Sequence, residues 1–338
     1  MAGREIENDS ANLRRTVRRL IDAGRVNSAM KRVLDDGRVI VPSAESLEAL
    51  KQKHLPASST AIIGVPQNAQ PLVLERSSIE RAIRSMSVAS AAGPDGLFVS
   101  HLKQMLGADA GAAKESFITS LYAFSSACTA GRMPQQIARF FFGASLIALR
   151  KKDGGIRPIA VGCVLRRVIA KAACSLLREQ AANLLCPRQL GIGVSDGATA
   201  AAHAARRFLS SCKENEGILK LDFKNAFNTV DRSHMLTAVY THFPELAHFT
   251  FSSYGTASYL FHGSQHIESA QGVQQGDPLG PLLFSISTFE VTSTPYCRFA
   301  VWYLDDGSIG GSAREVLASL DRVAESCASI GLELNITK

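Results

Sequence analysis

Aromatic and β-branched residues alternate in the apolar part of residues 299–311, which read FAVWYLDDGSIGG. The aromatic and β-branched part of this stretch ends at Asp305 and Asp306, and Gly307 follows at once. An alternating run before an Asp-Gly pair predicts a β-hairpin with the pair in its turn. Two carboxylates at the tip of a buried hairpin require a neutralising cation, and their oxygens suit Mg²⁺ or Mn²⁺. An ordinary exposed Asp-Gly turn is the alternative interpretation.

Helical spacing of apolar residues dominates the first two thirds of the chain. Helices are predicted over residues 13–21, 77–86, 97–106, 114–129, 164–185 and 198–210. The first carries arginines opposite its apolar face, a pattern that suits either phosphate contacts or solvent. The second begins with Ser77 and Glu80, which have the spacing of a capping box. In the helix over 164–185, Leu176 and Leu177 are both predicted to face inward.

Two strand regions have charged residues at their ends. The apolar residues 140–149 predict a strand, and the basic, glycine-containing residues 150–158 extend it into a hairpin. Residues 218–223 predict a second strand, in which Leu221 shares the apolar face and Asp222 lies on the opposite face at the strand end. Both regions therefore place charged side chains where a strand meets a turn.

The remaining segments complete an α+β pattern. Asp231 is predicted to cap a helix. Residues 265–281 are rich in Gln and Gly and predict a loop that enters a helix. The last helix, over 313–329, has Leu317 among its inward-facing residues and stops at Gly331. From the strand that contains Asp222 onward, the order of elements is related to the split βαβ arrangement.

Composition narrows the class of protein. The 338 residues are 46% apolar, which is enough for one or two large cores, and the formal net charge of +7 suits a nucleic-acid partner or a surplus of surface lysine. The 7 cysteines include no C-x-x-C pair, which argues against a disulfide framework or a zinc site. No apolar signal core or membrane-length run is visible, so we expect an intracellular protein with no membrane partner.

The acidic residues of two distant segments suggest one metal centre. If the strand predicted over 218–223 and the hairpin predicted over 299–311 are neighbours, the carboxylates of Asp222, Asp305 and Asp306 converge on one edge of a sheet. Such a set can hold two ions about 3.5–4 Å apart for in-line phosphoryl transfer. The basic hairpin supplies groups that could neutralise a triphosphate. These groups are Lys151, Lys152 and Arg157.

Six segments, in order along the chain, resemble those of reverse transcriptases, in particular those of non-LTR (LINE-like) retrotransposons. They are AAGPDG at 91–96, KKDGGIRPI at 151–159, LDFKNAF at 221–227, QQGDPLGP at 274–281, YLDD at 303–306 and GLELNITK at 331–338. The resemblance extends from about residue 75 to the end of the sequence. A match of six motifs in family order is far more specific than any of the motifs alone.

The resemblance implies a right-hand polymerase that uses an RNA template, a DNA primer and dNTPs. Residues 1–75 would form a charged helical region and linker, 76–215 the fingers region, and 216–338 a palm of split βαβ type. Asp222, Asp305 and Asp306, with the backbone of Phe223, would hold two Mg²⁺ ions, for which Mn²⁺ could substitute. The residues implied in substrate binding are Lys151, Lys152, Arg157, Phe227 as a sugar gate, Gln275, Gly276 and Lys338. Plain core packing is the alternative role for Phe227.

Departures from the family pattern lead to a second hypothesis. The sequence stops where the family continues into a thumb, and no endonuclease motif is visible. The helix after Pro281 contains poor helix formers such as Thr288 and Thr292, so we expect it to be short. The alternative hypothesis is therefore a catalytically silent, truncated relic that binds nucleic acid through the same groove. The natural template, the oligomeric state and a nuclear location are not determined by the sequence.

Overall fold

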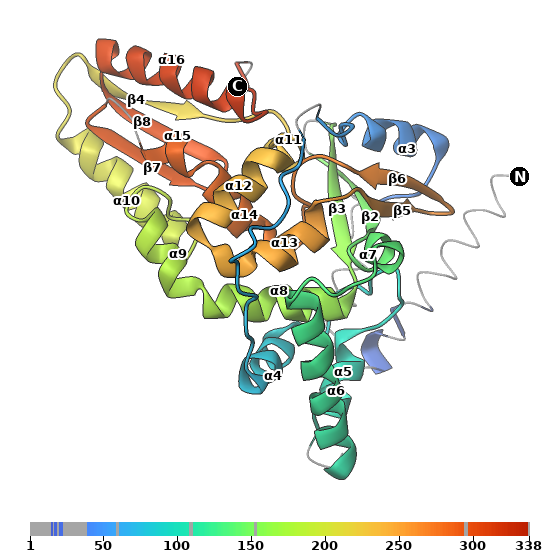
Figure 1. Ribbon diagram of the computed structural model, residues 1–338. Coiled ribbons are helices and arrows are strands. Elements are labelled where there is room, and N and C mark those ends of the chain that lie inside the picture. The colour runs from blue at the N-terminus through green and yellow to red at the C-terminus, as the bar shows by residue number, and fades with distance from the viewer. Residues whose placement is uncertain are drawn as a thin grey trace, which may run out of the picture.

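The computed structural model describes residues 39–336, apart from 59–60, 108–110, 152–153 and 294–296, together with isolated positions between 15 and 22 (Figure 1). The described positions between 15 and 22 are helical, as predicted, whereas Leu13, Arg14 and Arg19 of that helix lie outside the described residues. Lys152 and Lys338, both predicted to contact substrate, also lie outside them.

The first sheet contains the predicted basic hairpin. Its strands are β1 (Val39–Ile40), β2 (Ala144–Arg150), β3 (Ile156–Gly162), β5 (Ser258–His262) and β6 (Gln265–Ser269). Strands β2 and β3 are antiparallel over their full length, which confirms the hairpin. Strand β5 runs parallel to the start of β2, and β1 pairs with the end of β2. Leu50 of α3 (Ala44–Lys51) packs on this sheet with Leu146 and Leu260. The sheet thus joins segments from very different parts of the sequence.

Two features of this sheet differ from the sequence-based expectation. The β5–β6 hairpin begins before the region predicted as a loop and extends into it. Strand β6 was not predicted because its sequence is largely polar and only Ile267 and Ser269 are buried. The predicted strand over 140–149 also starts too early. Its first two residues end helix α7 (Gln135–Phe141), in which Phe140 stays exposed beside β5.

The helices that were predicted between residues 75 and 215 lie close to their predicted ranges, whereas α3 and α7 were not predicted. They are α4 (Arg76–Ser85), α5 (Val99–Met105), α6 (Gly111–Thr129), α8 (Val164–Leu176), α9 (Arg178–Leu185) and α10 (Gly197–Ser210). The predicted capping box is wrong, because α4 starts one residue earlier with Glu75 as its N-cap and the Ser77 hydroxyl donates to the Glu75 carboxylate. The single helix predicted over 164–185 is broken at Leu177 into α8 and α9. Leu177 is buried as predicted, whereas Leu176 is 47% exposed, contrary to prediction.

The second sheet carries the acidic residues. It is antiparallel, in the order β4 (Glu216–Leu221), β8 (Asp306–Ser312) and β7 (Phe299–Tyr303). Strand β4 is shorter than predicted at its end, so Asp222 and Phe223 follow it directly. Helix α10 packs against β7 and β4, and α16 (Ala313–Ser329) against β8 and β4. The predicted stop at Gly331 is confirmed by its φ of +80°, whereas Leu317 is 59% exposed and not inward.

The turn of the acidic hairpin is displaced from its predicted place. Tyr303 pairs with Asp306, so the turn consists of Leu304, with a φ of +56°, and Asp305. Gly307 lies in β8 directly opposite Trp302, and a Cβ there would come within 2.4 Å of the Trp302 ring. The glycine is therefore needed for the close approach of the indole and not for the turn.

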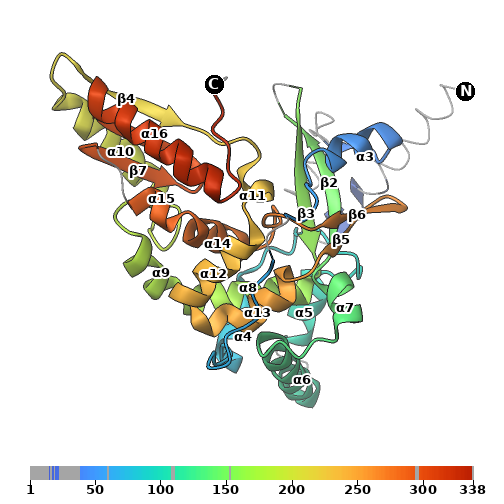
Figure 2. The ribbon, with the colours of Figure 1, turned by 45° about the horizontal axis from the view of Figure 1, so that its top comes forward.

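The remaining helices connect the two sheets. They are α11 (Ala226–Thr229), α12 (Arg232–His242), the 3₁₀ turn η2 (Pro244–Leu246), α13 (Ala247–Tyr254), α14 (Gly280–Ser287) and α15 (Phe289–Ser293). The side chain of Asp231 caps α12 as predicted. The break at Thr288 confirms that the helix after Pro281 is short. Figure 2 shows the two sheets on either side of α12, α14 and α8. One large core joins these helices to the second sheet through Leu236, Phe284 and Trp302.

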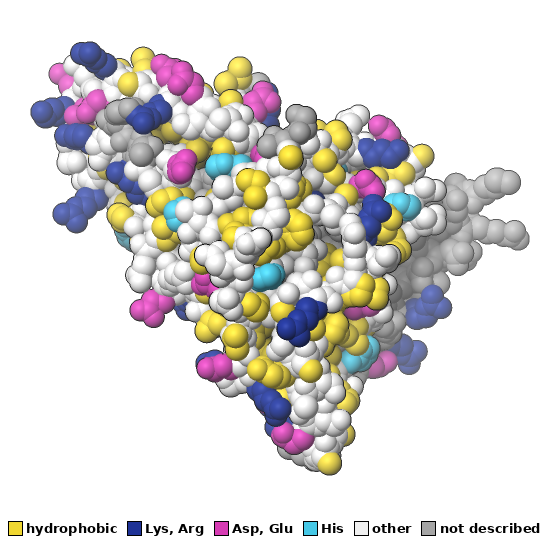
Figure 3. All heavy atoms as spheres, viewed as in Figure 1, with side chains coloured by type: hydrophobic (Ala, Val, Ile, Leu, Met, Phe, Trp, Pro, Cys, Tyr) yellow, Lys and Arg dark blue, Asp and Glu magenta, His cyan; other side chains and the backbone are white. Residues whose placement is uncertain are grey.

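The mixed α+β class predicted from the sequence is confirmed, whereas the domain boundaries stay a prediction. On the face shown in Figure 3, basic and acidic side chains are interspersed among the described residues. In the part of the chain that the structure describes, no helix has both the length and the apolar character needed to cross a bilayer.

Candidate active site

A cavity of about 720 Å³ lies where β3, α11, the loop at 274–277 and the turn of the acidic hairpin meet. Eight of the residues singled out from the sequence line it: Lys151, Arg157, Asp222, Phe223, Phe227, Gln275, Gly276 and Asp305. Asp306 does not line it and is exposed. Residues predicted from four separate sequence segments therefore share one cavity, and Asp306 follows Asp305 directly in the sequence.

Pairing of β4 with β8 brings the carboxylates together. Leu221 lies opposite Gly307, so Asp222 comes beside the hairpin turn at the same edge of the sheet. Burial raises the pKa of Asp305, and the nearby charges of Asp306 and Asp222 raise it further, while Arg157 acts in the opposite direction. Carboxylates crowded in this way favour a cation as a partner.

The acidic residues fit a magnesium site of the open kind. Among the described residues, no group of three or more His, Cys, Asp or Glu side chains is arranged to hold a metal by itself. In many proteins, however, Mg²⁺ is bound by only one or two carboxylates, and water and substrate phosphates complete its coordination shell. Asp222 and Asp305, which line the same cavity, provide that number of carboxylates.

Asn335 orients one of these carboxylates and was not singled out from the sequence. Its side-chain amide donates a hydrogen bond to Oδ2 of Asp222, and its backbone N–H donates to the Asp222 carbonyl oxygen. Phe223 and Leu334 form a β-bridge beside these bonds. Asn335 belongs to the segment 331–338 that carries the resemblance, but the resemblance implied a role only for Lys338 in that segment.

Backbone contacts hold the loop at 274–277, which would form the nucleotide floor, against β3. The N–H of Ala160 donates a 2.7 Å hydrogen bond to the carbonyl oxygen of Gln275. Gly276 has a φ of +123°, and a Cβ there would lie 2.4 Å from the carbonyl oxygen of Ala160. Only glycine satisfies both this backbone conformation and this approach. The cavity wall formed by Gln275 and Gly276 is thus fixed relative to the hairpin that carries Arg157.

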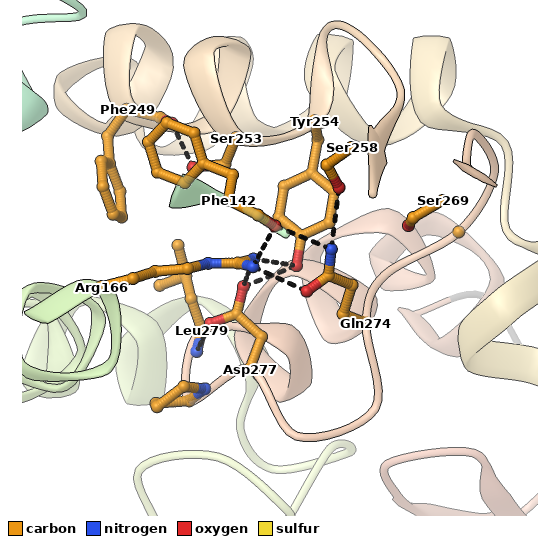
Figure 4. A network of polar contacts seen from close by, with 12 residues as sticks. Phe142, Arg166, Phe249, Ser253, Tyr254, Ser258, Ser269, Gln274, Asp277 and Leu279 are labelled. Carbon is orange, nitrogen blue, oxygen red and sulfur yellow. Dashed lines mark hydrogen bonds and ion pairs between the residues drawn. The ribbon is translucent and has the colours of Figure 1, made fainter. Parts of the chain in front are cut away.

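A buried polar network holds both ends of the same loop (Figure 4). Arg166 of α8 forms an ion pair with Asp277 at 2.6 Å, and the two side chains are 2% and 3% exposed. The Arg166 guanidinium also donates to Gln274 Oε1, and Tyr254 donates to the Asp277 carboxylate at 2.6 Å. Burial opposes the charge of Arg166, but Asp277 and Tyr254 favour it, so the Arg166 pKa is raised.

The network defines what Gln274 and Asp277 do. The amide of Gln274 donates to the Phe142 carbonyl oxygen and to the Ser258 hydroxyl, so its side-chain nitrogen is engaged in the network (Figure 4). In the sequence Arg166 is one of three basic residues in the helix, and nothing there indicates a partner 111 residues away. These residues position the loop. Gln274 and Asp277 lie in the segment 274–281 that carries the resemblance, whereas sequence reasoning missed Arg166 and Tyr254 because only the fold brings them to this loop.

Phe227 packs in the core and also lines the cavity, while its role as a sugar gate stays a prediction. Its ring stacks on that of Phe284, with centroids 4.6 Å apart and planes 16° apart. Phe227 also lines the cavity, and its carbonyl oxygen accepts a hydrogen bond from the N–H of Val273. Packing on α14 therefore fixes the ring in the cavity wall.

Comparisons with known proteins agree with these features. A family model described as reverse transcriptase (RNA-dependent DNA polymerase) matches residues 149–338. The "Retrotransposable element SLACS 132 kDa protein" of Trypanosoma brucei gambiense is 30% identical over 215 residues, which are 60% of this chain and 18% of that protein. The chain thus corresponds to less than a fifth of the length of this curated relative.

Solved structures with partial similarity include telomerases from two Candida species. The telomerase from Candida albicans, in complex with a fragment of telomeric RNA, has a TM-score of 0.47 and 13% identity, with coverage of 61% of this chain and 44% of that chain. The apo telomerase from Candida tropicalis has a TM-score of 0.44 and 13% identity, with coverage of 59% and 49%.

Proposed function

Because this chain belongs to the reverse transcriptase (RNA-dependent DNA polymerase) family, we propose that its cavity is the active site of an RNA-directed DNA polymerase. The reaction adds dNTPs to the 3′-hydroxyl of a DNA primer on an RNA template. The observation that carries the proposal is the convergence of Asp222 and Asp305 with the basic Lys151 and Arg157 around one cavity. The similarity to the SLACS protein supports an origin in a non-LTR retrotransposon.

The acidic edge of the second sheet is the proposed metal site. Asp222, Asp305 and the backbone carbonyl of Phe223 would hold two Mg²⁺ ions, for which Mn²⁺ could substitute, and the exposed Asp306 would be a peripheral ligand. When bound, these ions would lower the pKa of the attacking hydroxyl and offset charge on the leaving pyrophosphate. Asn335 keeps the Asp222 carboxylate oriented for that role.

The other walls of the cavity fit the remaining parts of a nucleotide. Lys151 and Arg157, which form no ion pair within the described part of the chain, would neutralise the triphosphate. Gln275 and Gly276 would form the surface beneath the base. Phe227, fixed by Phe284, would contact the sugar.

Primer extension on an RNA template with Mg²⁺ tests the proposal. The wild-type chain should extend the primer, and Asp305→Asn should lower kcat/KM on the order of 10³-fold or more, because asparagine keeps the size but loses the charge. Asp306→Asn, at an exposed position outside the cavity, is the matched control and should cost less activity. Equal activity of wild type and Asp305→Asn would refute the assignment. A wild-type chain that binds nucleic acid but never extends the primer would instead favour the silent relic.

A further inference from the structure

The segment before α4 links the first sheet to helix α12 and the turn η2, although it precedes the residues matched by the family model. Strand β1 pairs with β2 in the first sheet. Further along, the Ser233 hydroxyl donates to the Ala61 carbonyl oxygen at 2.7 Å, and the N–H of Leu72 donates to the Glu245 carbonyl oxygen. We refer to the described residues of 39–75 as the strap. The strap starts on the sheet of the basic hairpin and ends on the helices beside the acidic sheet.

Lys53 lies where the strap passes the cavity and is one of the residues that line it. Its N–H donates to the Leu50 carbonyl oxygen at 3.0 Å. Its carbonyl oxygen accepts a 2.7 Å hydrogen bond from the side-chain amide of Asn225. Asn225 adopts a φ of +52° and accepts a bond from Asn228 that holds its amide group in place. The backbone of Lys53 is therefore fixed against the wall three residues after Asp222.

The ammonium group of Lys53 has no ion-pair partner in the described part of the chain. Within the described residues its ammonium forms no ion pair, whereas nearby lysines do: Lys51 pairs with Glu48, and Lys224 pairs with Glu333. Lys53 thus joins Lys151 and Arg157 as a third cation on the cavity wall without an acidic ion-pair partner in the described chain. Three such cations in one cavity call for a multiply charged anion as ligand.

We propose that Lys53 binds the triphosphate of the incoming nucleotide, so that the strap contributes a substrate-binding residue from outside the matched region. This inference rests on the proposed function, because the triphosphate belongs to the dNTP substrate. The position of Lys53 favours the nucleotide over the nucleic-acid backbone as its ligand. Its backbone is hydrogen-bonded to Asn225, and the two residues after Asn225, Ala226 and Phe227, line the cavity wall where the sugar would lie.

Steady-state primer extension provides the first test. Lys53→Gln keeps most of the side-chain length and removes the charge, and it should raise the KM for dNTP about tenfold while kcat changes little. Lys53→Arg should retain most of the affinity. Lys51→Gln is the matched control, because it removes one lysine from the same segment at an exposed position outside the cavity, and its KM should equal that of wild type. Thermal unfolding of each variant confirms that it is folded.

A binding measurement separates this inference from the proposed function. The affinity of the chain for dTTP with Mg²⁺ should fall about tenfold in Lys53→Gln, and the affinity for thymidine, which has no phosphate, should not change. If wild type fails to extend a primer, the proposed function fails, yet the dTTP measurement still decides the role of Lys53. Unchanged KM and unchanged dTTP affinity would overturn the inference. So would weaker binding of an RNA–DNA duplex with unchanged dTTP affinity, because Lys53 would then contact nucleic acid.

Discussion

The side-chain amide of Asn335 donates a 2.9 Å hydrogen bond to Oδ2 of Asp222, and the Asn335 N–H donates a 2.8 Å bond to the Asp222 carbonyl oxygen. The two residues are 113 positions apart in the sequence. This double contact fixes both the backbone and the carboxylate of a residue in the proposed metal site. Groups that orient a metal ligand commonly affect function nearly as much as the ligand itself.

Replacing Asn335 should therefore weaken metal-dependent activity without unfolding the protein. Asn335→Leu removes the amide but retains the backbone bond, and we expect the apparent Mg²⁺ affinity or kcat in primer extension to fall about 10- to 100-fold. Glu333→Gln is the control, because Glu333 lies on the same segment and pairs only with the exposed Lys224. Magnesium titrations that coincide for wild type and Asn335→Leu would show that the bond has no role in activity.

Gly276 should tolerate no side chain. Gly276→Ala places a Cβ 2.4 Å from the Ala160 carbonyl oxygen at a φ of +123°. We expect a loss of unfolding free energy on the order of 2 kcal/mol or more and a higher KM for dNTP, because the loop must move away from β3. In Gly64→Ala nothing lies within 4 Å of the new Cβ, so urea unfolding should change by less than about 0.5 kcal/mol. Equal stability of the two variants would contradict the close approach.

The buried pair of Arg166 and Asp277 should matter far more than an exposed pair. Arg166→Met leaves the Asp277 carboxylate buried without its cation, so the free energy of unfolding should fall by about 3–5 kcal/mol in urea titrations. Adding Asp277→Asn should recover part of that loss, since the unpaired charge is removed. Arg84, which pairs with Glu80 at 3.7 Å and is 57% exposed, provides the comparison.

For Arg84→Met the loss should stay below about 1 kcal/mol. If Arg166→Met is as mild as Arg84→Met, or if the double variant is no better than Arg166→Met, the charge of Asp277 is compensated elsewhere and the network does not act as described.

Phe227 should exclude ribonucleotides. A ribose 2′-hydroxyl would need volume that the ring fills, and the ring cannot retreat because it stacks on Phe284. We expect discrimination on the order of 10²-fold in kcat/KM between dNTP and rNTP. Phe227→Val should reduce this ratio, whereas Phe227→Tyr should leave it nearly unchanged. A Phe227→Val variant that loses dNTP and rNTP activity equally would show that the ring serves only to pack the core.

Several features of this protein follow from the sequence by itself. The basic β2–β3 hairpin, the cap at Asp231 and the helix stop at Gly331 depend on interactions within a few residues, so turn and capping chemistry predicts them. Asp222 and Asp305 were predicted to converge because each follows a predicted strand, and both line one cavity, whereas the metal chemistry stays a prediction. The family resemblance added the order of the motifs.

Other features were decided only by tertiary structure. Gly307 looked like a turn residue, but its place in β8 is determined by the Trp302 ring that packs on it. The polar strand β6 forms because its backbone pairs with that of β5, and the residue pattern of β6 alone does not predict this pairing. The ion pair of Arg166 with Asp277 and the approach of Lys53 to the cavity join residues far apart in the sequence. Local propensity is decided within a few residues, whereas these contacts depend on how whole elements pack, and packing is settled only when the complete chain folds.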